Sequence, residues 1–269
     1  MRFGVCTWIF GDSPLEAVAA RLAAIGYDGV ELFGDPGAHP VAEVKPVLQD
    51  HGLSVLSLTP KDVDLAHPSL SARNSALDYY FHLLDYAAEL GAPMVACHGA
   101  VGRIRAMARQ AQEEGWFLEE VRLIAERARS LDLRVCLEVL NRYESHLLNT
   151  AKQARIFVDR VDSEALGILL DAYHMNIEEA DPVAAVEMAG SKLFLFHAAD
   201  SNRLGVGHGH VPFEALLAAL GQQGYSGDIV IECTASGPDP FTPVKGDGWQ
   251  EAAYREVAFS LEALHGLRG

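Results

Sequence analysis

The chain is poor in positive charge. Lys and Arg total 21 against 37 Asp and Glu, which gives a formal net charge of −16 at pH 7. Proteins that bind a nucleic-acid backbone depend on clustered Lys and Arg to neutralise phosphates and release counterions. The composition therefore argues against nucleic-acid partners and leaves a small, uncharged molecule as the expected ligand.

The sequence also lacks an apolar run long enough to span a bilayer, and its N-terminus does not have the form of a signal peptide. Its four cysteines show no CxxC or zinc-finger spacing, so we expect buried free thiols in a reducing compartment. These features predict a cytoplasmic protein without a membrane partner. No low-complexity segment or Pro/Ser-rich linker divides the chain, which predicts a single domain over residues 1–269.

Short apolar runs alternate regularly with helical stretches. Strands are predicted at 3–6, 29–32, 54–58, 94–97, 134–137, 166–170, 193–196 and 229–231. Helices are predicted at 15–25, 41–51, 71–90, 111–131, 150–161, 182–189, 212–221 and 249–264. Strands without polar alternation are typical of a parallel sheet covered by helices. Eight such units predict a (β/α)8 TIM barrel, whose active site lies at the carboxyl ends of the strands.

An open, doubly wound sheet is the alternative fold. In such folds a glycine-rich phosphate-binding turn usually follows the first strand. Here the first strand is followed by WIFGDSP, which is not a turn of that kind. The closed barrel is therefore favoured.

A potential metal ligand follows each of the last four predicted strands. These residues are Glu138, Asp171, His197 and Glu232. Barrel closure would bring them to one rim, where three carboxylates repel one another unless they are neutralised. An oxygen-rich set with one imidazole suits Mn²⁺, Mg²⁺ or Co²⁺ better than structural zinc. One acid alone could be a helix cap or an ion-pair partner, but four residues in register predict a divalent-metal site.

Three strings around these residues resemble the D-tagatose 3-epimerase and D-psicose 3-epimerase group of the xylose isomerase-like TIM barrels. The strings are EVLNRYESHLLNT, LLDAYHMNIEE and FHAADSNR, the last followed by the glycine-rich GVGHGHVPF. The resemblance is dense from about residue 135 to residue 235. In the first half of the chain it is limited to the fold.

This resemblance implies a set of site residues. A divalent cation, typically Mn²⁺, would be held by Glu138, Asp171, His197 and Glu232. The substrate's hydroxyl and carbonyl oxygens would be bound by Glu144, His174 and Arg203. Judged on residue chemistry alone, each of these three has a structural alternative: Glu144 can orient Arg142, His174 can cap a turn in the loop after its strand, and Arg203 can neutralise the acidic rim.

Other candidate residues come mainly from the first half of the chain. Trp8 and Phe10 follow the first strand and Glu31 ends the second, so we expect them to form a wall of the pocket, where aromatic rings suit the C–H faces of a sugar. His98 follows the fourth strand and would either bind sugar or satisfy a loop carbonyl. The glycine-rich loop 205–211 carries two histidines, and we expect a hydrogen-bonded surface loop rather than a mobile cover.

Ketose epimerisation requires the kinds of residue that are predicted at the carboxyl ends of the strands. Inverting C3 requires removal of the proton beside the C2 carbonyl and its return to the opposite face, so two bases are needed. Glu138 and Glu232, three strands apart, are placed to act as these general acid/base groups. A cation on O2 and O3 would stabilise the cis-enediolate. We therefore predict a metal-dependent isomerase that inverts C3 of a free ketose.

Three other functions remain open. An aldose–ketose isomerase, including the hydroxypyruvate and inosose types, uses a similar enediolate on the same metal site. A non-catalytic sugar-binding barrel would need the metal and Arg203 but not two opposed glutamates. A nuclease of the endonuclease IV type would need more histidines and a basic groove, which the charge of −16 opposes.

The preferred sugar and the assembly state are less constrained by the sequence. The loop CTWIFGDSP and the pair Ala172–Tyr173 depart from the epimerase pattern. A ketohexose, a ketopentose, a deoxy sugar or an oxidised sugar therefore all remain possible substrates. By analogy with other barrels we expect a homodimer or homotetramer.

Overall fold

The computed structural model describes residues 1–268, and the last residue of the predicted domain, Gly269, lies outside this range. Its strands are β1 (Phe3–Cys6), β2 (Gly29–Phe33), β3 (Ser54–Thr59), β4 (Met94–Cys97), β5 (Arg134–Glu138), β6 (Leu166–Asp171), β7 (Leu193–Ala198) and β8 (Asp228–Ile231). Its α-helices are α1 (Leu15–Ile25), α2 (Val41–Asp50), α3 (Leu70–Leu90), α4 (Gln110–Ser130), α5 (Ala151–Val161), α6 (Ala172–Glu178), α7 (Pro182–Ala189), α8 (Phe213–Gln222) and α9 (Trp249–Arg268). Two short 3₁₀ helices are η1 (Thr7–Phe10) and η2 (Gly190–Lys192).

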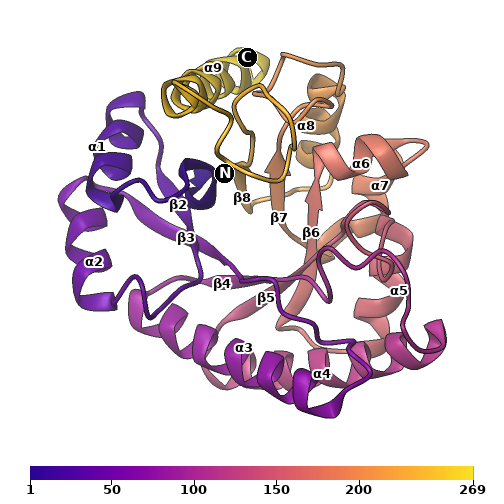
Figure 1. The fold of residues 1–269 in the computed structure, drawn as a ribbon. Helices are drawn as coiled ribbons and strands as arrows, with labels where there is room; N and C mark the ends of the chain where they lie inside the picture. Colours follow the sequence, from indigo (N-terminus) through magenta and orange to yellow (C-terminus); the bar gives the residue numbers. More distant parts are fainter. Residues whose placement is uncertain (269) are drawn as a thin grey trace.

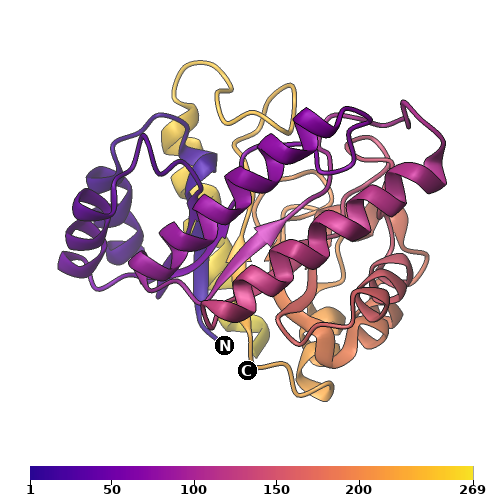
Figure 2. The same cartoon turned by 90° about the horizontal axis from the view of Figure 1, so that it is seen from below.

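The strands form a nearly closed parallel barrel. Their hydrogen-bonded order is β3-β2-β1-β8-β7-β6-β5-β4, and the two end strands, β3 and β4, lie next to each other. Figure 1 shows the helices as an outer ring around these strands, and Figure 2 shows α3 and α4 side by side on the outside. The predicted (β/α)8 TIM barrel is confirmed.

The strands are buried on both faces, as their unbroken apolar runs predicted. Close backbone packing reinforces this burial at Gly29 on β2, where a Cβ atom would lie 2.3 Å from the carbonyl oxygen of Ser54. A larger residue at this position would push β2 away from β3. One hydrophobic core extends from Phe3 near the start of the chain to Leu264 in α9.

The structure differs from the sequence prediction where the last strands end. Glu138, Asp171 and His197 belong to the strands, because the ladder continues through the pairs Glu138↔Leu169 and Asp171↔His197. The prediction that His174 lies in a loop is wrong, since it lies in α6. This helix begins directly after Asp171, whose carboxylate accepts a hydrogen bond from the Tyr173 N–H at 2.7 Å. The candidate metal ligands Glu138, Asp171 and His197 are thereby placed at the rigid end of the barrel.

Two further sequence predictions, on membrane-spanning segments and on the cysteines, can be compared with the described residues. Across residues 1–268, none of the helices combines the length and the apolar character needed to cross a bilayer. The four cysteines predicted to be buried free thiols are buried and free, which confirms that prediction.

Candidate active site

Four buried side chains converge at the carboxyl ends of β5 to β8. They are Glu138, Asp171, His197 and Glu232, and each offers a ligand atom within 4.8 Å of the others. His197 Nδ1 lies 3.1 Å from Glu232 Oε2 and 3.8 Å from Glu138 Oε1. The predicted convergence on one rim is therefore present in the fold.

The donor set fits a divalent cation. Three carboxylates are buried together, and they are contacted by the guanidinium of Arg203 and the imidazole of His197. Arg203 Nη1 donates to Asp171 at 2.7 Å, and its Nη2 donates to Glu232 at 2.8 Å. Glu138 accepts from neither nitrogen, so a cation between Glu138 and the other ligands would complete the neutralisation. Hard oxygen donors with one imidazole suit Mn²⁺ or Mg²⁺.

The carboxylates of this cluster have different electrostatic environments. Burial, reinforced by the charge of Glu232, raises the pKa of Glu138 well above its usual value. Burial also raises the pKa of Asp171 to about 6, although Arg203 acts in the opposite direction. Burial opposes ionisation of Glu232 as well, but Arg203 and His197 hold its pKa well below the usual value. Without a cation the cluster therefore retains protons, which cation binding would displace.

Trp8 holds one of the ligand glutamates in place. Its indole Nε1–H donates to Glu232 Oε1 at 2.7 Å, while Arg203 donates to Oε2 of the same carboxylate. Trp8 comes from η1, directly after β1, and it also lines the cavity above the cluster. The residue that was predicted to contact substrate thus donates a hydrogen bond to the carboxylate directly after β8.

Arg203 is delivered to the cluster by an unusual backbone conformation. Its φ is 63°, in the left-handed region that costs a non-glycine residue about 1–3 kcal/mol. Backbone hydrogen bonds fix this conformation, since Arg203 N donates to Asp200 O and Thr234 N donates to Arg203 O, both at 2.8 Å. Within the described structure, its buried Nε has no hydrogen-bond partner. Arg203 itself is among the residues that line the cavity.

His174 presents one defined N–H toward the cluster. Asn141 Nδ2 donates to His174 Nδ1 at 2.7 Å, so Nδ1 is the acceptor and Nε2 carries the hydrogen. This Nε2 lies 3.6 Å from Asp171 Oδ2 and 3.9 Å from Glu138 Oε1. Burial, together with the charge of Arg203, lowers the pKa of His174 well below its usual value. His174 is therefore a neutral donor facing the ligand cluster.

Glu144 lies beside His174 and is held by the same asparagine. Asn141 Nδ2 donates to Glu144 Oε1 at 2.7 Å, and His174 Nδ1 lies 3.4 Å from that oxygen. Burial raises the pKa of Glu144 to about 7, although Arg203 acts to lower it. Both Glu144 and His174 line the cavity, as expected of residues that contact a ligand.

The raised pKa of Glu144 gives a prediction about stability and pH. Its folded pKa of about 7 lies above the ordinary value of 4.5, so the stability it contributes is present below pH 4.5 and is lost as pH rises through about 7. Glu144→Gln removes this loss. In cation-free protein, the melting temperature of the variant minus that of the wild type should therefore increase from about pH 5 to about pH 8. A difference that does not change with pH would contradict this assignment.

The cavity above the cluster has a volume of about 650 Å³. His98, predicted to face the rim, is 5% exposed and lines this cavity, and its Nδ1 has no partner among the described residues. The acidic residues that line the cavity are Asp12, Asp35, Asp62, Glu138, Glu144 and Glu232. Arg203 is the single Arg or Lys in the described lining, and it is already bound to Asp171 and Glu232. The cavity therefore disfavours anionic ligands.

Several sequence predictions need correction. Phe10 does not form a wall of the pocket, because it is fully buried and stacks on Tyr254 with ring centroids 4.5 Å apart. Glu31 does not form a wall either, because its carboxylate is fully buried and hydrogen-bonded to His197. Arg142 pairs with Glu178 at the surface, so Glu144 does not orient it.

The glycine-rich loop is a hydrogen-bonded surface loop, as predicted. His208 Nδ1 lies 2.7 Å from Glu256 Oε2, and its ring stacks on Phe259. His210 Nδ1 lies 3.0 Å from Ser201 Oγ. These contacts dock the loop on α9 and on the segment after β7.

Comparisons with known proteins agree with this fold. Residues 19–260 match the family described as xylose isomerase-like TIM barrel. A ketose 3-epimerase of Arthrobacter globiformis is 33% identical, over 86% of this chain and 82% of that protein. A 3-dehydro-D-guloside 4-epimerase of Escherichia coli K12 is 29% identical, over 89% of this chain and 95% of that protein. The solved D-psicose 3-epimerase of Clostridium cellulolyticum H10 with D-tagatose has the same fold, with a TM-score of 0.90 over 99% of both chains at 24% identity.

The chain therefore belongs to the xylose isomerase-like TIM barrel family, and its similarity to ketose 3-epimerases makes it an isomerase. The family resemblance expected from the strings around Glu138, Asp171 and His197 is confirmed. The similarity covers most of the chain, including the first half, where the sequence motifs alone indicated only the fold.

Proposed function

We propose that this protein is a metal-dependent epimerase that inverts C3 of a free ketose through a cis-enediolate. The observation that carries this proposal is the position of Glu138 at the end of β5 and of Glu232 directly after β8, with both carboxylates in the ligand cluster and in the lining of the cavity. Similarity to ketose 3-epimerases supports the same activity. A non-catalytic sugar-binding barrel is not supported, because such a protein would not need two opposed glutamates.

In this proposal Glu138, Asp171, His197 and Glu232 hold the cation. When bound, the cation would supply Lewis-acid stabilisation of negative charge on the sugar's oxygens. Mn²⁺ suits the donor set best, with Mg²⁺ or Co²⁺ as substitutes.

The residues of the chain have separate tasks in proton transfer. One of the two glutamates, Glu138 and Glu232, removes the C3 proton, and the other returns a proton to the opposite face. Trp8 and Arg203 hold Glu232 through hydrogen bonds of 2.7 and 2.8 Å, so this group enters the reaction already oriented. His174 donates its Nε2–H to a substrate oxygen as that oxygen gains charge.

Three further residues would bind the hydroxyl groups of the substrate. Glu144, at the cavity wall beside His174, accepts from a hydroxyl, and the free Nε–H of Arg203 donates to one. His98 has an unpartnered Nδ1 for the same purpose. The acidic lining supports an uncharged sugar rather than a sugar phosphate.

The size of the cavity favours a second candidate, an epimerase for a keto-sugar that carries a substituent. A free ketohexose has about a dozen heavy atoms, fewer than the drug-sized ligands for which cavities of ~300–1,000 Å³ are typical. The cavity of about 650 Å³ extends to Asp12, Asp35 and Phe241, well beyond the ligand cluster. The relative that acts on a guloside at C4 makes this a concrete alternative.

Product analysis separates these functions. We expect the Mn²⁺-loaded protein to convert one or more of fructose, tagatose, psicose and ribulose into its C3 epimer, as measured by NMR of the reaction mixture. An aldose product would identify the aldose–ketose isomerase instead. Epimerisation of a 3-keto-glycoside at C4, without reaction of free ketoses, would identify the second candidate.

We also propose a domain organisation, a location and an assembly state for the molecule as a whole. The continuous core from Phe3 to Leu264 supports a single domain. The four free thiols support a cytoplasmic location. A homodimer or homotetramer stays a prediction, which sedimentation of the purified protein would test.

A further inference from the structure

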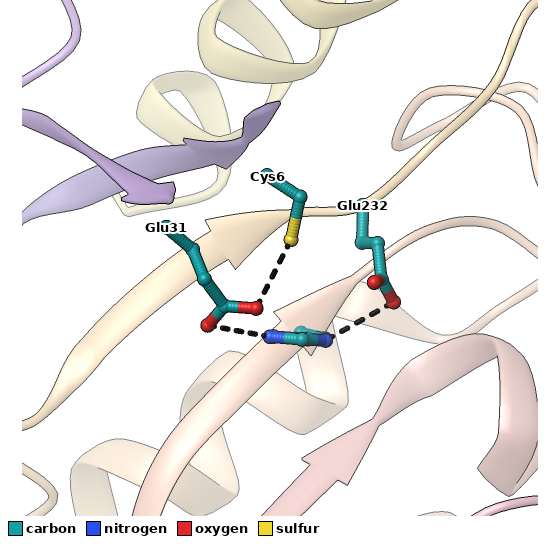
Figure 3. A group of neighbouring side chains, drawn as sticks. Cys6, Glu31 and Glu232 are labelled. Atoms are coloured by element: carbon teal, nitrogen blue, oxygen red, sulfur yellow. Dashed lines mark hydrogen bonds and ion pairs between the residues drawn. The ribbon is translucent and has the colours of Figure 1, made fainter. Parts of the chain in front are cut away.

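The imidazole of His197 lies between two glutamates that come from opposite parts of the chain. Its Nδ1 lies 3.1 Å from Glu232 Oε2, and its Nε2 lies 3.2 Å from Glu31 Oε2. Figure 3 shows Glu31 and Glu232 pointing toward the ring from its two sides, with Cys6 above Glu31. Glu31 thus contacts His197, one of the four predicted ligands, without being a predicted ligand itself.

Glu31 itself is held rigidly by donors from neighbouring strands. Thr59 Oγ1 donates to its Oε1 at 2.6 Å, and the Cys6 thiol donates to the same oxygen at 3.3 Å. The hydroxyl of Ser57 donates to Oε2. Because Glu31 is fully buried, these donors and His197 replace the water that would otherwise solvate its charge. Burying a carboxylate costs free energy that such partners offset, and a charge kept at this place indicates a task for Glu31.

The orientation of the ring defines that task. An imidazole binds a cation through the lone pair of one nitrogen, and its other nitrogen then carries a hydrogen that needs an acceptor. Nδ1 of His197 faces Glu138 and Glu232, on the side where the ligand atoms converge. Nε2 faces Glu31, so Glu31 is the acceptor that leaves Nδ1 free for the cation.

A second cation site at Glu31 is the alternative. Cys6, Glu31, His197 and Glu232 also offer ligand atoms within 4.8 Å of one another. Occupation of this site would require loss of the proton of Cys6, and burial, together with Glu31, raises the pKa of this thiol well above its usual value. It would also require both nitrogens of His197 as ligands and would break the hydrogen bonds that Glu31 accepts. The geometry therefore favours an orienting contact over a second cation.

We propose that Glu31 is a positioning residue, which accepts the Nε2–H of His197, fixes the ring so that Nδ1 binds the cation, and increases the basicity of that nitrogen. The proposal rests on the proposed cation site. Loss of such a carboxylate–histidine contact typically weakens metal binding by about 10–100-fold.

The test compares two neutralised buried glutamates. Glu31→Gln keeps the size of the side chain but removes its charge, and we expect Mn²⁺ binding measured by titration calorimetry to weaken by about 10–100-fold. Glu113→Gln is the matched control, because Glu113 is equally buried but pairs with Arg103 and His146 and contacts none of the ligands. The control should keep the Mn²⁺ affinity of the wild type. Unchanged affinity in Glu31→Gln, or an equal loss in both variants, would overturn the proposal.

A second measurement uses the wild type and does not depend on the folding of a variant. In protein labelled with ¹⁵N-histidine and loaded with Mg²⁺, which is diamagnetic, NMR should show the hydrogen of His197 on Nε2. A hydrogen on Nδ1, or two Mn²⁺ ions bound per chain, would contradict the orienting role. Absence of Mn²⁺ binding by the wild type would instead overturn the cation site itself, so the two failures are distinguishable.

Discussion

Glu232→Gln should lower turnover by about 10²–10⁴-fold at saturating Mn²⁺, because it removes one of the two proton-transfer groups. In the wild type both oxygens of Glu232 accept hydrogen bonds, from Trp8 on one side and from Arg203 on the other. The amide of glutamine keeps an oxygen that can bind the cation but cannot take up the C3 proton. Initial rates of ketose epimerisation at increasing Mn²⁺ concentrations measure the effect.

Trp8→Phe is the control for this variant. It removes the hydrogen bond to Glu232 Oε1 but leaves the carboxylate and the contact with Arg203 in place. We expect it to retain far more activity than Glu232→Gln. Full activity in Glu232→Gln would remove Glu232 from the acid/base role, whereas equal losses in both variants would attribute the effect to disturbed orientation.

Removal of the cation should abolish turnover and lower the melting temperature. It leaves Glu138, Asp171 and Glu232 buried together, with Arg203 bound to only two of them. A ligand at 100 times its Kd stabilises the folded state by about 2.7 kcal/mol, which corresponds to a shift of roughly 5–10 °C for a domain of this size. Thermal melts with and without chelator, followed by addition of Mn²⁺, measure both the loss and its recovery.

Asp171→Asn provides the control for cation removal. The variant keeps an acceptor for the Tyr173 N–H, which caps α6, but loses a charged ligand of the cluster. Added Mn²⁺ should therefore raise its melting temperature less than that of the wild type. An unchanged melting curve of the wild type after verified removal of the metal would count against the shared site.

The barrel and the convergence of its four candidate ligands could be predicted from the sequence, because parallel strands of a closed barrel all end at one rim. A polar residue at the end of an apolar run therefore has a known location even when its partner lies far away in the chain. Glu138 and Glu232 are examples, since each directly follows or ends such a run. Asp171 has both of the roles that a single acid at a strand end could have on its own, helix cap and ion-pair partner. One of its oxygens caps α6, and the other accepts from Arg203.

The contacts that orient these ligands could not be predicted in the same way. The bond between Glu31 and His197 spans 166 positions, and the bond between Trp8 and Glu232 spans 224. Each depends on the direction in which a side chain leaves its strand or turn. Glu31 ends the second predicted strand, and we expected it in the wall of the pocket, whereas its side chain is buried against His197. The φ of 63° at Arg203 likewise has no signal in the residue type.

The position of solvent deuterium in the sugar tests the central claim most directly. The Mn²⁺-loaded protein, incubated in deuterated buffer with a ketose that it converts, should place deuterium at C3 of the product, because Glu138 and Glu232 exchange protons with solvent between removal and return. Deuterium only at C1 would contradict the account in favour of an aldose–ketose isomerase. No exchange into any ketose or keto-glycoside would contradict proton transfer at this site altogether.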